Sequence, residues 1–198
     1  MHFKTYKYKI LKSTNDQAIN FIKNSNINYG YVMSDIQTSG RGTAKKKWIS
    51  LKGNLFGSIF FPLKKNFPAF NEFTFISPTI IYNAIKTFCK SCELSFKWPN
   101  DILINNKKIC GILQEVVRTN NRDYLIIGMG INLVTNPKIK GLRTTNIFDE
   151  TKIKIDRNEI VKKIVGMFEK FFLEIKTYSF QYYKNKANSL SIEPNNLI

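Results

Sequence analysis

The chain has 198 residues, 43% of them hydrophobic and 14% aromatic, which is typical of one globular domain and excludes an intrinsically disordered chain. Its 31 Lys and Arg against 14 Asp and Glu give a formal net charge of +17, which either serves an anionic partner or reflects a lysine-rich composition. No apolar run is long enough to cross a membrane and residues 1–10 lack the apolar core of a secretory signal, so we expect a soluble cytoplasmic protein.

The first part of the chain predicts a strand, a helix and a second strand. Residues 3–11 alternate polar and apolar side chains, as a half-buried strand does. Ser13-Thr14 then offers a helix N-cap, and the apolar side chains that follow share one helical face: Ala18, Ile19 and Ile22. Residues 29–36 are apolar and β-prone and predict the next strand.

A polar loop at 37–47 separates this strand from an apolar, buried strand at 54–61. Residues 72–89 then have the spacing of a helix, and Pro78 is expected to kink it or to delay its start. The side chains on the inward face of this helix are Phe73, Ile76, Ile80, Ala84 and Phe88.

The middle of the chain predicts a β meander. Its strands cover residues 94–98, 102–104, 109–117 and 124–134. Asn105-Asn106 joins the second and third of these strands, because Asn tolerates the positive φ of tight hairpin turns.

The last element is a helix that follows Asp156-Arg-Asn-Glu159, a sequence that resembles a capping box. Helices at the start, middle and end, with hairpin-connected strands between them, predict an α+β fold. We expect a mixed, mostly antiparallel sheet backed by helices on one side. The final helix buries Ile160, Ile164, Phe168, Phe171 and Ile175.

The three cysteines leave several interpretations open. Cys89 and Cys92 have a zinc-like spacing, but a structural zinc site needs four ligands, and Cys110 and His2 would have to supply the others. A redox role is the second alternative. The interpretation we favour is three small buried side chains in a reducing compartment.

Four segments have unusual compositions for strand ends and loops. Ser39–Trp48 combines two glycines with Arg41 and three lysines, which suits an approaching anion but also fits a solvated basic loop. Phe96–Asp101 contains Trp-Pro-Asn-Asp in a turn. Glycines inside predicted strands, which indicate a bulge or a close approach by a ligand, occur in Lys107–Glu115 and Ile126–Leu133.

Taken together and in this order, the segments resemble the catalytic domain of biotin–protein ligases. The resemblance begins at Ser13-Thr-Asn15 and covers about residues 5 to 185, and Trp-Pro-Asn-Asp and Gly-x-Gly-Ile-Asn are its most specific motifs. It implies ATP-dependent ligation of biotin to a lysine of a biotin carboxyl carrier protein through biotinyl-AMP. It also implies a mixed sheet backed by helices, similar to that of class II aminoacyl-tRNA synthetases.

The resemblance further implies roles for individual residues. Arg41 and Lys108 are expected to be catalytic cations, and Asp101 is expected to face the phosphates and the incoming lysine. The adenine and ATP contacts are expected at Trp48, Lys97, Asn100 and Asn132. The expected biotin contacts are Ser13, Thr14, Asn15, Gln37, Gly40, Arg41, Gly42, Thr43, Lys108, Gly111, Gly128 and Gly130.

The implied cofactor is Mg²⁺ with ATP, since magnesium neutralises the triphosphate, and no direct protein ligand to the metal is predicted. The sequence departs from the family at Thr43, where a further Arg is common, and this change is expected to weaken retention of the adenylate. Residues 1–185 are expected to form the catalytic domain and 186–198 a tail where longer members begin an SH3-like domain.

Two other functions remain as alternatives. A lipoate or octanoate ligase shares the scaffold, and a basic nucleic-acid-binding module would need one continuous cationic stripe with exposed aromatic rings. With only 12 residues before Ser13, a winged helix is not expected, so DNA binding should be nonspecific and salt-dependent. The sequence leaves open whether the protein is a homodimer.

Overall fold

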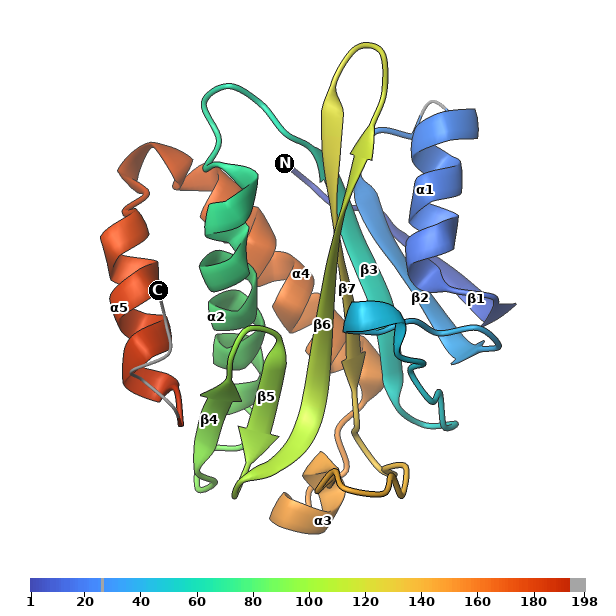
Figure 1. The fold of residues 1–198 in the computed structure, drawn as a ribbon, viewed down its shortest axis with the longest axis vertical. Coiled ribbons are helices and arrows are strands. Elements are labelled where there is room, and N and C mark those ends of the chain that lie inside the picture. The colour runs from blue at the N-terminus through green and yellow to red at the C-terminus, as the bar shows by residue number, and fades with distance from the viewer. Residues whose placement is uncertain (26, 193–198) are drawn as a thin grey trace.

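The computed structural model describes residues 1–25 and 27–192. Within them, seven strands form one mixed sheet with the order β1-β2-β3-β7-β6-β5-β4 (Figure 1). The strands are β1 (Thr5–Leu11), β2 (Gly30–Gln37), β3 (Leu55–Pro62), β4 (Leu94–Lys97), β5 (Asp101–Ile104), β6 (Lys107–Arg118) and β7 (Asp123–Ile131).

The described helices are α1 (Thr14–Asn24), α2 (Phe73–Lys86), the short α3 (Ile147–Thr151), α4 (Arg157–Leu173) and α5 (Phe180–Leu190). The three predicted helices correspond to α1, α2 and α4, whereas α3 and α5 were not predicted from the sequence. The predicted α+β class is therefore confirmed, with each predicted strand and helix shifted by only a few residues at its ends.

The expectation that all helices lie on one side of the sheet is wrong. Strand β1 pairs in parallel with β2, and two parallel neighbours need a crossover connection, which α1 provides. Helix α1 therefore stands on one face of the sheet, while α2, α4 and α5 lie on the other (Figure 1). The remaining strand pairs are antiparallel.

Two apolar clusters match the two faces. On the α1 face, Ala18 and Phe21 pack with Val32, Phe60 and Ile126. The larger cluster joins the opposite face to α2, α4 and α5, and the predicted inward residues Phe73, Ile76, Ile80, Ala84, Ile160, Ile164, Phe168 and Phe171 are buried in it. The two other predicted inward residues, Phe88 and Ile175, lie beyond the ends of α2 and α4 and are only partly buried. Because the smaller cluster covers only part of its face, the rest of that face is available for a cavity.

Several local signals behave as predicted. The Ser13 side chain caps α1 by accepting from Asp16 N, and Asn105 and Asn106 adopt φ values of 49° and 59° in the β5–β6 turn. Asp156 caps α4 but accepts from Asn158 N, so the reciprocal contact of a capping box with Glu159 is not formed. Helix α2 begins at Phe73 and contains Pro78, so the proline does not delay its start.

The C-terminal boundary of the fold lies beyond the expected one. Helix α5 continues to Leu190, and Ile192 N donates to Phe96 O at 3.0 Å, which attaches the chain to the edge strand β4. Residues 186–192 thus belong to the same domain as the sheet, and the rest of the predicted tail, 193–198, lies outside the described residues.

The three cysteines are buried as free thiols, as expected. Burial raises the pKa of Cys89 to about 12, which makes its thiolate, the form that binds metals, strongly unfavourable. Among the described residues, no group of three or more His, Cys, Asp or Glu side chains could hold a metal ion. No described helix has the length and apolar character needed to cross a membrane.

Glu150, in α3, fastens the β5–β6 turn to the segment after β7. Its carboxylate accepts from Lys107 Nζ (2.8 Å), Thr145 Oγ1 (2.7 Å) and Asn105 Nδ2 (2.7 Å). Burial favours the neutral acid, but these three hydrogen bonds favour the carboxylate and lower the pKa of Glu150 overall. The folded state therefore gains stability from ionised Glu150 above its unfolded pKa and loses it as the pH falls through the folded pKa.

We expect Glu150→Gln to lower the free energy of unfolding by about 1 kcal/mol at pH 7, a modest loss because the Lys107 side chain is half exposed. The difference between the two proteins should shrink as the pH falls through about 4 and below, and denaturant titrations over this range measure it. Glu174→Gln, at an exposed carboxylate 3.8 Å from Lys170, is the matched control. A difference that stays constant across the acid range would contradict the assignment.

Candidate active site

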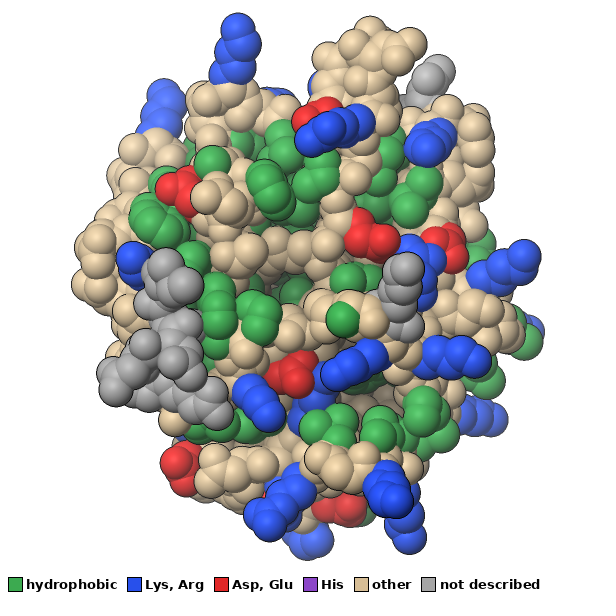
Figure 2. Space-filling view, in the orientation of Figure 1, with side chains coloured by type: hydrophobic (Ala, Val, Ile, Leu, Met, Phe, Trp, Pro, Cys, Tyr) green, Lys and Arg blue, Asp and Glu red, His purple; other side chains and the backbone are tan. Residues whose placement is uncertain are grey.

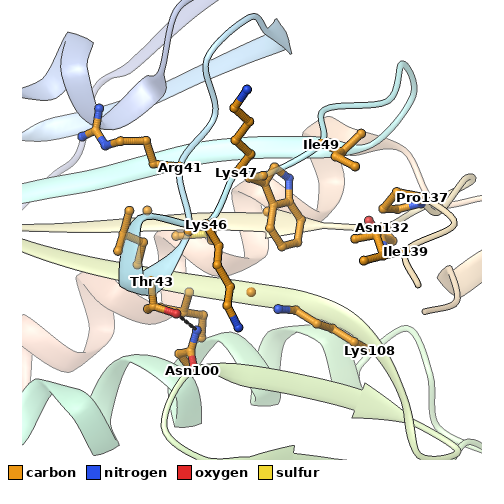
Figure 3. A pocket seen from close by; sticks show the side chains of 18 of the residues that line it. Arg41, Thr43, Lys46, Lys47, Ile49, Asn100, Lys108, Asn132, Pro137 and Ile139 are labelled. Atoms are coloured by element: carbon orange, nitrogen blue, oxygen red, sulfur yellow. Dashed lines mark hydrogen bonds between the residues drawn. The ribbon is translucent and has the colours of Figure 1, made fainter. Parts of the chain in front are cut away.

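A cavity of about 610 Å³ opens on the α1 face of the sheet. Its lining comes from the N-terminus of α1, the end of β2, the loop at 40–49, the β4–β5 turn, the central parts of β6 and β7, and the loop at 137–144 (Figure 3). Elements far apart in the sequence therefore meet at one site, where the sheet is not covered by a helix.

One end of the cavity is a buried polar network. Thr14 N and Oγ1 both donate to Gln37 Oε1, at 2.8 and 3.1 Å. Ser58 Oγ lies 2.7 Å from Thr14 Oγ1 and 2.5 Å from Asn15 Oδ1. These side chains hold one another in fixed positions, because α1 presents Thr14 and Asn15 from its first turn directly over the sheet.

The glycines inside the strands explain how side chains lie so close to the sheet. A Cβ at Gly128 would lie 2.3 Å from Asn15 Oδ1, and a Cβ at Gly130 would lie 2.3 Å from the indole of Trp48. Gly111 pairs with Gly130, and a Cβ at Gly111 would lie 2.6 Å from the same indole. The close approach predicted at these glycines is thus made by Asn15 and Trp48 of the chain itself.

Lys108 lies at the centre of the cavity lining. Its Nζ is 2.7 Å from Asp101 Oδ1 and 5.4 Å from the centre of the Trp48 ring. The Lys108 and Asp101 side chains are each only 16% exposed, so their ion pair is largely shielded from water. Asp101 is not among the residues that line the cavity, so the structure uses its carboxylate to hold Lys108.

Every charged residue that lines the cavity is a cation. Of these, Lys46 and Lys108 direct their ammonium groups toward the same region beside Asn100, whereas Lys47 points away from it (Figure 3). A region with several cations and no lining carboxylate attracts anions such as carboxylates and phosphates. The cationic lining residues are Arg41, Lys46, Lys47, Lys97, Lys108 and Lys140.

Arg41 differs from the lysines of this set because two carboxylates, and not one or none, face its charge. Its guanidinium donates to Asp16 and to both carboxylate oxygens of Glu115, at 3.1 and 2.9 Å. Burial lowers the pKa of Arg41, but these acidic partners outweigh burial and raise the pKa overall. Its side chain points away from Lys46 and Lys108 (Figure 3).

The other end of the cavity is a slot with apolar walls and a polar floor. Ile49, Pro137 and Ile139 surround Asn132 (Figure 3), which is 2% exposed. Asn132 Nδ2 donates to Thr145 O at 3.0 Å, but Oδ1 is buried without a hydrogen-bond partner among the described residues. Trp48 Nε1 is likewise buried without such a partner. The unpaired Oδ1 of Asn132 suits a flat ring that carries an N–H donor, and the unpaired N–H of Trp48 suits an acceptor on the ligand.

Most of the site residues predicted from the sequence meet in this cavity. Thr43 lies at its mouth, where its Oγ1 accepts from Asn100 Nδ2 at 3.3 Å. Gly40 does not line the cavity; it accepts from Trp48 N at 2.9 Å and closes the base of the loop. The predicted residues that line it are Ser13, Thr14, Asn15, Gln37, Arg41, Gly42, Thr43, Trp48, Lys97, Asn100, Lys108, Gly111, Gly128, Gly130 and Asn132.

Sequence reasoning missed one whole wall and one carboxylate. The wall is the loop at 137–144, which carries no motif and is brought to the cavity by hydrogen bonds from Asn136 Nδ2 to Thr144 and from Lys108 N to Arg143 O. The carboxylate is Glu115, which ends the segment Lys107–Glu115. No pattern in the sequence indicates that it pairs with Arg41.

The residues present do not form a protein cage for magnesium. The cavity lining contains no Asp or Glu, and the neighbouring Asp101 is engaged by Lys108. Hard divalent cations prefer several oxygen ligands, which this lining does not supply from carboxylates. We therefore derive no step through a protein-bound metal.

Comparisons with known proteins show the family of the chain. The model of the biotin/lipoate A/B protein ligase family matches residues 8–132. The bifunctional ligase/repressor BirA of Bacillus subtilis is 31% identical over 184 residues, which cover 87% of this chain and 55% of that protein. A biotin–[acetyl-CoA-carboxylase] ligase of Paracoccus denitrificans is 25% identical over 78% of this chain and 68% of its own length.

A solved structure of the biotin protein ligase from Aquifex aeolicus in complex with biotin and ATP has a TM-score of 0.81 and 28% identity. The match covers 96% of this chain and 78% of that one. The chain spans about half the length of the Bacillus relatives it matches. Because the family model covers well over half of the sequence, the chain belongs to the biotin/lipoate A/B protein ligase family.

Proposed function

We propose that this protein activates biotin with ATP to form biotinyl-AMP and transfers the biotinyl group to a lysine of a biotin carboxyl carrier protein. The observation that carries the proposal is one cavity whose charged lining residues are all cations, between a polar network and a slot with an unpaired acceptor. The names of the ligase relatives and the biotin and ATP bound to the Aquifex neighbour support it.

The first step brings two anions together. An oxygen of the biotin carboxylate attacks the α-phosphorus of ATP, and pyrophosphate leaves. Fixed cations lower the barrier where these charges meet, since they need no reorganisation during the reaction. Lys108, oriented by Asp101, is suited to this position, and Lys46 adds a second ammonium from the loop. Magnesium bound to the triphosphate oxygens would shield the remaining charge.

The polar end of the cavity favours biotin over other acids of the family. The fused ring of biotin offers N–H donors and a carbonyl acceptor, which can exchange hydrogen bonds with Thr14, Asn15 and Gln37. An octanoyl or lipoyl chain presents only apolar atoms there, so it would form no hydrogen bonds with the buried polar groups.

The second step needs no covalent enzyme intermediate. The amine of the carrier lysine attacks the acyl carbon of biotinyl-AMP, an amide forms, and AMP and a proton are released. The loop at 40–48 contributes to the cavity lining and would limit hydrolysis of the mixed anhydride by excluding water. The net positive charge of +17 would favour association with an acidic carrier surface.

The proposal is tested by ATP–pyrophosphate exchange in the presence of biotin, lipoate or octanoate. We expect exchange with biotin and little with the two other acids. A preference for lipoate or octanoate would make the protein a ligase for that acid, and no exchange with any acid would contradict ATP-dependent activation. Transfer to a purified carrier domain, followed by mass spectrometry, then tests the second step.

We expect Lys108→Ala to reduce biotin-dependent exchange on the order of a hundredfold, since each charge-assisted hydrogen bond to a phosphate or carboxylate contributes roughly 1.5–3 kcal/mol. Lys108→Gln keeps a hydrogen-bond donor beside the buried Asp101 and shows whether the loss comes from charge or from misfolding. Lys65→Ala, at an exposed lysine, is the control. Exchange near the wild-type rate in both Lys108 variants would remove this residue from the mechanism.

We expect Asn132 Oδ1 to accept from the exocyclic amine of adenine, because it is a buried acceptor without a partner in the described structure. Guanine places a carbonyl oxygen at that position, so wild-type protein should use ATP and not GTP. Asn132→Ala should raise the KM for ATP by about tenfold and reduce the ATP/GTP ratio, which is the ratio of the exchange rates with the two nucleotides. The affinity for biotin, measured by calorimetry, should change little. An unchanged ATP/GTP ratio would contradict this assignment.

A further inference from the structure

Glu115 joins three parts of the molecule through one carboxylate. Its two oxygens accept from Arg41 Nη2 at 3.1 and 2.9 Å, and Oε2 also accepts from Asn15 Nδ2 at 2.5 Å. Arg41 Nη1 donates to Asp16. Strand β6, the first turn of α1 and the loop at 40–48 are therefore connected at a single point, which we call the Arg41 clasp: Asp16, Arg41 and Glu115.

The clasp lies at the base of the loop. Trp48 N donates to Gly40 O at 2.9 Å, and Gly42 N donates to Lys46 O at 2.7 Å, so the loop is closed by its own backbone. Those bonds fix the shape of the loop but do not attach it to the sheet. At one end of the loop the Trp48 indole lies on the sheet, and at the other end the Arg41 side chain joins the loop to β6 and α1. At the loop tip, Thr43 accepts an exposed hydrogen bond from Asn100 of the β4–β5 turn.

The charge of Arg41 is matched within the clasp without a ligand, because two carboxylates face its one guanidinium. The Arg41 side chain points away from the region that Lys46 and Lys108 share (Figure 3). A cation held in this way has little positive charge left for a substrate. This geometry differs from the catalytic role that the sequence resemblance implies for Arg41.

We propose that Glu115, with Asp16, is a positioning residue that holds Arg41 as the anchor of the loop, so that the loop, with Lys46, stays over the cavity that binds the acid. The inference deepens the proposed function, on which its kinetic part rests. Because neither carboxylate touches reacting atoms, loss of the clasp should weaken binding of the acid and leave the rate of the chemical step nearly unchanged.

The structural part is tested by hydrogen exchange of the ligand-free protein, measured by mass spectrometry on peptides covering residues 40–48. Arg41→Gln and Glu115→Gln should each increase exchange of this segment by about tenfold, since each removes a charge-assisted contact that opposes loop opening. The double variant should exchange no faster than Arg41→Gln, because the loss of Arg41 already removes its contact with Glu115. Glu159→Gln, an exposed carboxylate on α4, is the matched control and should change nothing.

The kinetic part uses biotin-dependent pyrophosphate exchange. Both single variants should raise the KM for biotin by about tenfold, with kcat within about twofold of wild type. If Arg41 instead contacts the substrate, Arg41→Gln will lower kcat and Glu115→Gln will not. That pair of results would overturn the proposal. Unchanged hydrogen exchange of residues 40–48 in both variants would overturn it as well. Inactivity of the wild-type protein with every acid would contradict the proposed function, while the hydrogen-exchange result would still decide the clasp.

Discussion

The site depends on a patch of the sheet that has no side chains. Gly111, Gly128 and Gly130 lie on adjacent strands β6 and β7, and a Cβ at any of them would overlap Asn15 or Trp48. This absence lets the first turn of α1 and the end of the loop at 40–48 lie directly on the backbone. The polar network at one end of the cavity and the indole at the other are both positioned by this contact.

The cations that line the cavity are of two kinds, those that form ion pairs and those that do not. Lys108 and Arg41 are held by carboxylates outside the cavity lining, whereas Lys46, Lys47, Lys97 and Lys140 form no ion pair with any described residue. A held lysine keeps its ammonium in one place, which suits a developing charge, while free lysines attract anions less specifically. On the face shown in Figure 2, Lys and Arg are dispersed and do not form one stripe.

The sequence could predict what depends on neighbours in the chain. The Ser13 cap, the Asn105-Asn106 turn and the glycines in β6 and β7 follow from local backbone chemistry, and all were placed correctly. The position of α1 opposite the other helices depends on parallel pairing of β1 with β2, which no local pattern specifies. The wall at 137–144 and the pairing of Glu115 with Arg41 are long-range contacts, and apolar spacing or turn residues carry no information about them.

The central claim is that the cavity binds an acyl-adenylate along the glycine patch, with Lys108 at the phosphate. A crystal structure of the protein with a non-hydrolysable biotinyl-AMP analogue tests it most directly. We predict the ring of biotin against Thr14, Asn15 and Gln37, the phosphate mimic beside Lys108 and Lys46, the adenine amine on Asn132 Oδ1, and Arg41 still on Glu115. An analogue bound elsewhere, or one in which Lys108 makes no contact with the phosphate mimic, would contradict the account.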